Sequence, residues 1–281
     1  MSKRSARESG RATPADERRE RIEQHLSRLG LDGLDVDAHL AWAREHHPSD
    51  VEVVERLLAQ AVAIRRERSI EWRIRGSGLK VRKSMAAFDW PFQPKLDRRA
   101  VEDLFTLSFL DRREDVLVTG KSGTGKSHIL QALALKTCER EIMVRYARCV
   151  DLVDDLSAGL ADGSYERRMR RWCRPSLLVI DDVGLGQLKR RDEEATAAHL
   201  LFTLLDRRHM NVSTTLTSNI KLSAWGKYLG DATLAAAVLD RLAATSIHID
   251  IDGPSYRQFL ARKRAEEHGQ QPPAELESDE P

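Results

Sequence analysis

One octapeptide constrains the fold of this chain more than any other feature. Residues 120–127 read Gly-Lys-Ser-Gly-Thr-Gly-Lys-Ser, and they lie between the apolar run 116–118 and the helical pattern 128–133. A strand, a glycine-rich loop and a helix in this order are typical of the phosphate loop of nucleoside triphosphatases. Its glycines let backbone N–H groups turn inward around the β- and γ-phosphates. The chain is therefore predicted to bind a nucleoside triphosphate.

The phosphate loop, residues 120–127, supplies most of the predicted contacts to the nucleotide. Lys126 is expected to place its charge on the β- and γ-phosphates, and the Ser127 hydroxyl is expected to ligate Mg²⁺. The complete predicted set of nucleotide-binding residues is Gly120, Lys121, Ser122, Gly123, Thr124, Gly125, Lys126, Ser127, His128 and Asp181. The predicted cofactors are ATP and Mg²⁺.

A second site is expected where an apolar segment ends in two carboxylates. Residues 177–180 are Leu-Leu-Val-Ile, and Asp181 and Asp182 follow them. Asp181 is predicted to lie on the metal side of the site, and Asp182 is the candidate for polarising the attacking water. On its own this pattern fits a strand that ends in a solvated turn equally well. The phosphate loop upstream favours the catalytic interpretation.

Length and composition exclude several classes of protein. The 281 residues suffice for one core of domain size and a smaller partner. Cys138, Cys149 and Cys173 have no metal-ligand spacing and predict buried thiols in a reducing compartment. No run approaches the roughly 18 apolar residues of a membrane span, and no apolar signal region follows Met1. We therefore expect a soluble cytoplasmic protein that makes no membrane contact.

The basic residues gather in two clusters, although the formal net charge is only +2. One cluster lies between Arg65 and Lys83. The other comprises Arg167, Arg168, Arg170, Arg171 and Arg174. A run of like charge is usually a solvated face, so the sequence leaves solvent exposure and phosphate contact open for both clusters.

The order of patterns along the chain predicts its domain organisation. Residues 1–18 are expected to be a disordered tail, 19–76 a small helical domain, 77–265 the nucleotide-binding domain and 266–281 a disordered acidic tail. Strands are expected over 116–119, 142–147, 177–181, 214–217 and 247–251, with helices between them. This alternation predicts an α/β fold, with a parallel sheet covered by helices on both faces and nucleotide at the carboxyl ends of its strands.

Ordered blocks over residues 67–260 resemble the IstB group of AAA+ ATPases. The blocks include Phe88-Asp89, the phosphate loop, Asp181-Asp182-Val183-Gly184, Thr217-Ser218-Asn219, Asp240-Arg241-Leu242 and Ser255-Tyr256-Arg257. Members of this group are helpers of insertion-sequence transposition and are related to DnaC helicase loaders. The resemblance implies that residues 77–265 form a P-loop AAA+ parallel sheet flanked by helices, behind a small helical N-terminal domain.

The resemblance also implies roles for single residues. Asn219 would orient water near the γ-phosphate, and Arg241 would be the arginine finger that reaches the nucleotide of a neighbouring subunit. Arg257 is a second candidate cation near the nucleotide, and residues 88–94 would lie against adenine. Many members carry Glu where this chain has Asp182, so hydrolysis is expected to be slow.

A DNA-binding role follows from the same resemblance. An additional helix after the second strand lines a DNA channel in this group, and residues 150–171 occupy that place here. Arg167, Arg168, Arg170 and Arg171 thereby become candidates for DNA contact. No pattern for reading base edges is evident, so binding to duplex DNA is expected to be largely independent of sequence.

Together these implications predict an ATPase that assembles on duplex DNA as a ring or helical oligomer and recruits or activates a partner transposase. Two alternatives stay open. One is a DnaC-like loader of a replicative helicase, which would bind single-stranded DNA. The other is a nucleotide-gated interaction protein without significant hydrolysis.

Overall fold

The computed structural model describes residues 14–184 and 197–267. The chain divides into two compact units, residues 1–71 and 72–281, and each is considered by itself. In the described part of the chain, no helix combines the length and the apolar character that a membrane span requires. Cys138 and Cys149 are buried and Cys173 is half-buried, all as free thiols.

The first unit is helical. It contains α1 (Pro14–Arg28), α2 (Val36–His46) and most of α3 (Asp50–Ser77), which continues into the second unit. Helix α1 begins inside the segment that was expected to be a disordered tail. Its proline suits the first helical turn, and Asp16 and Glu17 complement the helix dipole there. The apolar pattern missed this start because the first large apolar residue of the helix is Ile22. Residues 1–13 lie outside the described part.

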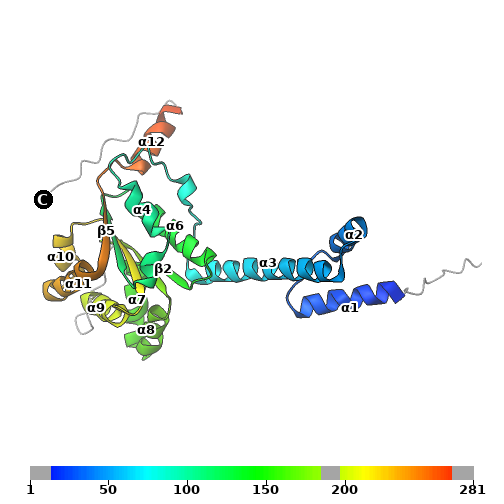
Figure 1. Ribbon diagram of the computed structural model, residues 1–281. Coiled ribbons are helices and arrows are strands. Elements are labelled where there is room, and N and C mark those ends of the chain that lie inside the picture. Colours follow the sequence, from blue (N-terminus) through cyan, green and yellow to red (C-terminus); the bar gives the residue numbers. More distant parts are fainter. Residues whose placement is uncertain (1–13, 185–196, 268–281) are drawn as a thin grey trace, which may run out of the picture. The chain divides into compact units, whose positions relative to one another are not determined.

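The second unit is built on one parallel sheet (Figure 1). Its strands are β1 (Asp115–Gly120), β2 (Val144–Arg148), β3 (Leu177–Val183), β4 (Ser213–Ser218) and β5 (Ser246–Ile251). They lie in the order β2-β3-β4-β1-β5, and every neighbouring pair is parallel. All five predicted strands are present, and the predicted α/β fold is confirmed.

Helices connect and cover these strands. They are η1 (Met85–Ala87), α4 (Arg98–Leu104), α5 (Ser108–Asp111), α6 (Lys126–Glu139), α7 (Cys149–Ala161), α8 (Tyr165–Cys173), α9 (Ala197–Arg208), η2 (Leu222–Ala224), α10 (Trp225–Leu229), α11 (Ala232–Thr245) and α12 (Tyr256–Glu267). Helix α9 lies between the third and fourth predicted strands, as expected, and residues 185–196 before it lie outside the described part. Helix α12 extends to Glu267, two residues into the predicted tail 266–281, and residues 268–281 lie outside the described part.

The two faces of the sheet are covered by different helices. One apolar cluster joins Leu178 and Ile180 of β3 to residues of α7, α8, α9, α10 and α11. Leu177 and Val179, which alternate with them along the strand, are also fully buried, and α6 packs against β3. Because successive strand residues point to opposite faces, Asp181 shares the side of Leu177 and Val179. The fold thus turns this carboxylate toward the helix that follows the phosphate loop.

A buried arginine fixes the amino ends of β3 and β4. The Arg208 side chain is 1% exposed, and its guanidinium donates to the carbonyls of Trp172, Cys173, Pro175 and Ser213 at 2.6–3.1 Å. Two of these carbonyls belong to the last turn of α8, where a cation also interacts favourably with the helix dipole. Burial lowers the pKa of Arg208 to about 10. Arg208 therefore ties α8 to the edge of the sheet.

Candidate functional site

The phosphate loop joins the carboxyl end of β1 to the start of α6, as predicted. Gly123 and Gly125 have φ angles of 84° and 106°, in the left-handed region that favours glycine. A Cβ atom on Gly123 would lie 2.1 Å from Ser255 Oγ, and one on Gly125 would lie 2.9 Å from the Phe88 ring. Only glycine therefore fits these two positions. The loop is closed against its neighbours by the Tyr256 backbone N–H, which donates to the Gly123 carbonyl at 2.9 Å.

Lys126 lies inside this loop. Its side chain is 3% exposed, and its Nζ donates to the carbonyls of Gly120 and Lys121 at 2.7 Å each. Burial lowers the pKa of Lys126 to about 8, while the carboxylates of Asp181 and Asp182 oppose that shift. A cation held between backbone dipoles and two carboxylates is suited to accept phosphate oxygens.

Asp181 is the centre of a hydrogen-bond network. Its Oδ1 accepts from Ser127 Oγ at 3.0 Å and from the Thr217 hydroxyl. Its Oδ2 accepts from the Tyr146 hydroxyl, to which Gln131 Nε2 donates at 3.1 Å. A hydroxyl and a carboxylate at this separation are the protein ligands that Mg²⁺ uses beside a triphosphate. Ser127 and Asp181 therefore fit the metal predicted for them.

The structure adds Tyr146 to the residues predicted from sequence. Tyr146 lies near the end of β2, the strand beside β3. Burial and the neighbouring Asp181 carboxylate raise the pKa of Tyr146, so its hydroxyl stays protonated and donates. The sequence signal that could have identified Tyr146 is its position near the carboxyl end of a predicted strand, because nucleotide binds at that edge of the sheet.

Asp182 occupies an irregular position in β3. The register between β3 and β4 shifts between Ile180 and Val183, and Asp182 has a φ of 61°. Its backbone N–H donates to Thr217 Oγ1 at 2.8 Å, and its Oδ1 accepts from Asn219 Nδ2 at 3.2 Å. Bulges of this kind redirect side chains beside active sites. The bulge brings together Asp182 and Asn219, the two residues predicted to handle water.

A hollow of about 480 Å³ opens beside the phosphate loop and is called the nucleotide pocket below. Its lining includes Lys126, Ser127, His128, Asn219 and Arg257. It also includes Phe88, Asp89 and Phe92 from the segment expected to lie against adenine. His128 Nε2 is already paired with the Ser84 carbonyl at 2.9 Å, and its ring meets Phe88 edge-on at 5.4 Å. The pocket thus combines phosphate-binding groups with an aromatic wall.

Gln93 holds this wall in place and was missed in the sequence. Its side chain is buried, and its Nε2 donates to the carbonyls of Thr124 and Pro254 at 3.1 and 2.9 Å. It therefore links the segment after η1 to the phosphate loop and to the turn after β5. Because these hydrogen bonds join three parts of the chain that are distant in sequence, no local sequence pattern predicts the role of Gln93.

Arg241 is not among the residues that line the nucleotide pocket. It lies on α11, its Nη2 donates to Asp206 Oδ1 of α9 at 2.7 Å, and its guanidinium stacks 4.3 Å from the centre of the Phe202 ring. The side chain is 31% exposed. The second candidate cation, Arg257, lines the pocket within the same chain.

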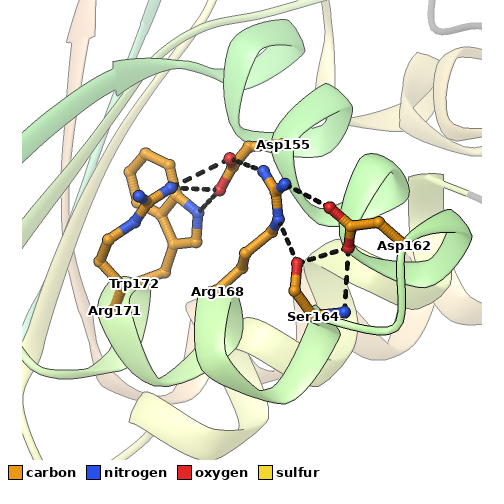
Figure 2. A network of polar contacts seen from close by, with 6 residues as sticks. All are labelled: Asp155, Asp162, Ser164, Arg168, Arg171 and Trp172. Atoms are coloured by element: carbon orange, nitrogen blue, oxygen red, sulfur yellow. Dashed lines mark hydrogen bonds and ion pairs between the residues drawn. The ribbon is translucent and has the colours of Figure 1, made fainter.

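The predicted DNA-contacting arginines of α8 separate into two groups. Figure 2 shows Arg168 between Asp155 and Asp162, with its Nη1 2.6 Å from Asp155 Oδ1 and its Nη2 2.8 Å from Asp162 Oδ2. Arg171 and the Trp172 indole N–H also reach Asp155, each at 2.8 Å. This network fastens α8 to α7. In contrast, Arg167 and Arg170 are exposed.

Comparison with known proteins identifies the family to which this site belongs. Residues 24–265 match the family described as IstB-like ATP binding protein. An ATP-binding protein of insertion sequence IS5376 from Geobacillus stearothermophilus is 35% identical over 254 residues, which cover 90% of this chain and 98% of that protein. The ATP-binding protein of insertion sequence IS21 from Pseudomonas aeruginosa is 33% identical over 244 residues, which cover 86% of this chain and 90% of that protein.

A solved structure shares the fold. AMPPCP-bound DnaA from Aquifex aeolicus matches with a TM-score of 0.52 at 19% identity, over 68% of this chain and 56% of that one. At this identity the match shows the fold alone, which is that of an AAA+ nucleotide-binding domain. The sheet order, the phosphate loop and the two insertion-sequence relatives all support the same family. The chain belongs to the IstB-like family of ATP-binding proteins.

Proposed function

We propose that this protein is an Mg²⁺-dependent ATPase that assembles on duplex DNA and recruits or activates a transposase. The observation that carries the proposal is the Ser127–Asp181 pair beside Lys126, in a chain whose relatives are ATP-binding proteins of insertion sequences. The names of those relatives, as proteins of insertion sequences, support a role in the movement of DNA. Cutting and joining of DNA strands would belong to the partner.

The residues that line the pocket and the two carboxylates beside it would have distinct parts in hydrolysis. Lys126 and the loop N–H groups hold the phosphates, and Ser127 and Asp181 would hold Mg²⁺, which when bound neutralises charge on the phosphate oxygens. Asp182 orients and polarises the attacking water, and Asn219 holds the Asp182 carboxylate in place at 3.2 Å. Arg257 adds positive charge from the pocket wall. Arg241 of a neighbouring subunit would complete the site in an oligomer.

DNA binding would use the exposed side of α8. Arg167 and Arg170 are exposed and free to contact phosphates, whereas Arg168 primarily fastens α8 to α7. Phosphate contacts carry no sequence information, so affinity should be similar for unrelated duplexes.

The test of this function is ATP hydrolysis measured with and without duplex DNA, followed by a pull-down that offers the ATP-bound protein a purified insertion-sequence transposase. We expect duplex DNA to stimulate hydrolysis and the ATP-bound protein to retain that transposase. Hydrolysis that is insensitive to every DNA would favour the nucleotide-gated interaction protein. Stimulation by single-stranded DNA alone, with retention of a replicative helicase, would favour the loader.

We predict that Tyr146→Phe raises the Mg²⁺ concentration for half-maximal hydrolysis by about 10-fold, the usual effect of losing a hydrogen bond to a metal ligand. The Tyr146 hydroxyl donates to Asp181 Oδ2, and its loss frees that carboxylate to turn. ATP binding measured in EDTA should be unchanged, because Tyr146 is not among the residues that line the nucleotide pocket.

Tyr165→Phe is the matched control for this change. It removes a half-buried phenol hydroxyl from α8, away from the nucleotide pocket. Its Mg²⁺ dependence should equal that of the wild type. If Tyr146→Phe shows the same Mg²⁺ dependence as this control, Tyr146 does not position Asp181.

A further inference from the structure

A second hollow lies at the edge of the sheet opposite the phosphate loop. It has a volume of about 440 Å³, within the roughly 300–1,000 Å³ of ligand pockets. Its floor includes Met143, Val144 and Pro175, which lie at the amino ends of β2 and β3. Nucleotide binds at the carboxyl ends, so this hollow is separate from the nucleotide pocket. We call it the arginine hollow.

Arginines from three parts of the second unit line this hollow. They are Arg73 of α3, Arg145 of β2, and Arg167, Arg170, Arg171 and Arg174 of α8 and the residue after it. Among the described residues that line it, none is acidic. Six cations around one hollow repel one another, and an anionic ligand would relieve that repulsion.

The helical period explains which arginines of α8 reach the hollow. At about 100° per residue, residues 167, 170, 171 and 174 fall on one side of the helix, and residue 168 falls toward the side of the buried Met169 and Trp172. Arg171 is partly neutralised by Asp155. Within the described part of the chain, no carboxylate pairs with Arg167, Arg170 or Arg174. These three guanidinium groups therefore keep their donors for a ligand.

Arg145 shows how crowded the cations are. Its guanidinium stacks 4.6 Å from the centre of the Trp172 ring. Burial lowers the pKa of Arg145, and the neighbouring Arg171 lowers it further. The folded protein holds these like charges together although their repulsion destabilises it. A binding role for the hollow would account for that cost.

Trp72 completes the arginine hollow with an exposed aromatic face. It lies on α3 at the boundary of the second unit, lines the hollow, and is 67% exposed. A large apolar ring left in solvent contributes nothing to the core. Beside unpaired arginines, a flat ring offers a stacking platform for a nucleic-acid base. An acidic peptide would use the arginines and leave this ring without a role.

We propose that the arginine hollow binds an unpaired segment of a DNA strand, with phosphates on Arg167, Arg170 and Arg174 and a base stacked on Trp72. The proposal rests on the proposed function for the kind of ligand and adds the site and the form of DNA it takes. Duplex bases are already stacked on one another, so Trp72 would act on distorted or opened DNA alone.

The test is fluorescence anisotropy of a labelled dT oligonucleotide of about 20 nucleotides, longer than the roughly 4–16 that one binding fold covers, and of a duplex of equal length. The full chain is used with Mg²⁺ and ATP. The variants are Trp72→Ala, Trp72→Phe and the double change Arg170→Ala with Arg174→Ala. The matched control is Arg99→Ala with Arg140→Ala, two exposed arginines outside the arginine hollow.

Trp72→Ala should weaken single-strand binding by roughly 5- to 150-fold, Trp72→Phe should restore most of it, and duplex affinity should be unchanged. The double arginine variant should lower the salt slope of single-strand binding by about 1.4, since each lost phosphate contact removes about 0.7. The control pair should match the wild type.

Three results would overturn the proposal. The first is a Trp72→Ala protein with wild-type affinity for the oligonucleotide. The second is a double arginine variant that behaves like the control pair. The third is competition by a poly-glutamate peptide as strong as that of unlabelled oligonucleotide, which would assign an acidic protein partner instead. If the wild type bound neither single strand nor duplex, the proposed DNA-binding function itself would be wrong. That result differs from the three above, in which the wild type binds DNA and only the arginine hollow is excluded as the site.

Discussion

The Lys126→Ala protein should bind ATP at least about 100-fold more weakly than the wild type, because charge-assisted hydrogen bonds to phosphate are each among the strong interactions of a site. Lys126 is 3% exposed, and its Nζ lies 2.7 Å from two loop carbonyls, so no other side chain of the loop can replace its charge. Isothermal titration calorimetry with Mg²⁺ measures the loss.

Lys121→Ala is the control for this substitution. Lys121 belongs to the predicted nucleotide-binding set through the loop backbone, which alanine retains; its side chain is exposed, and its carbonyl accepts from Lys126 Nζ. It should bind ATP within a few-fold of the wild type. Equal affinities of the wild type and Lys126→Ala would show that the phosphate loop is not the nucleotide site.

The second large effect is expected at Arg241. Arg241→Ala should retain ATP binding and lose about 10³-fold or more of DNA-stimulated hydrolysis, the usual contribution of an arginine finger. The resemblance to the IstB group implies that Arg241 acts on a neighbour's nucleotide, and Arg241 does not line the nucleotide pocket of its own chain. Mixing Arg241→Ala with Lys126→Ala should restore part of the turnover, because an intact loop then meets an intact finger.

Arg98→Ala serves as the matched control for Arg241→Ala. Arg98 also pairs with a carboxylate, Glu102 at 2.7 Å, and lies over an aromatic ring, Trp90 at 5.1 Å from its centre. Its loss should leave stimulated hydrolysis unchanged. A protein that stays monomeric by light scattering with ATP and duplex DNA, yet hydrolyses ATP at full rate, would contradict a shared site. A head-to-tail assembly should instead form rings or helical filaments.

The parts of the fold that could be predicted from sequence are those that depend on local patterns. The five strands are short apolar runs, and the phosphate loop requires its glycines within one octapeptide. Asp181 was predictable because parallel strands bring their carboxyl ends to one edge. The first residues of helix α1, 14–18, were assigned to the predicted tail because they are a proline, an alanine and charged residues, and the apolar residues at helical spacing begin only at Ile22.

The parts that could not be predicted depend on contacts between distant residues. Tyr146 of β2 donates to Asp181 of the neighbouring strand β3, and Gln93 joins the phosphate loop to the turn after β5. Trp72 and Arg145 lie far apart in the sequence, yet both line the arginine hollow. Each of these residues looks ordinary within its own segment. Their roles follow from the strand order, which local patterns do not specify.

The basic run of α8 shows an intermediate case. In sequence, Arg167, Arg168, Arg170 and Arg171 form a single cluster. The helical period alone separates residue 168 from the others. The carboxylates that pair with Arg168 come from α7 and the turn after it. The structural role of Arg168 could therefore be recognised only once the packing of α8 against α7 was known.

Asp182 illustrates how backbone geometry and chemistry combine. Its φ of 61° lies in the left-handed region, which Asp adopts more readily than Glu because its short polar side chain bonds locally. The bulge and the bond to Asn219 then hold the shorter carboxylate beside the nucleotide pocket. The shorter residue thus suits the backbone of this strand.

The central claim is that ATP binding enables this protein to assemble on DNA. The most direct measurement is the affinity for two labelled duplexes of equal length and unrelated sequence, with Mg²⁺ and ATP, without nucleotide, and with the Lys126→Ala protein. We expect tight and similar binding to both duplexes with ATP, much weaker binding without it, and no response of Lys126→Ala to ATP. Duplex binding that is equally tight with and without ATP would contradict the claim.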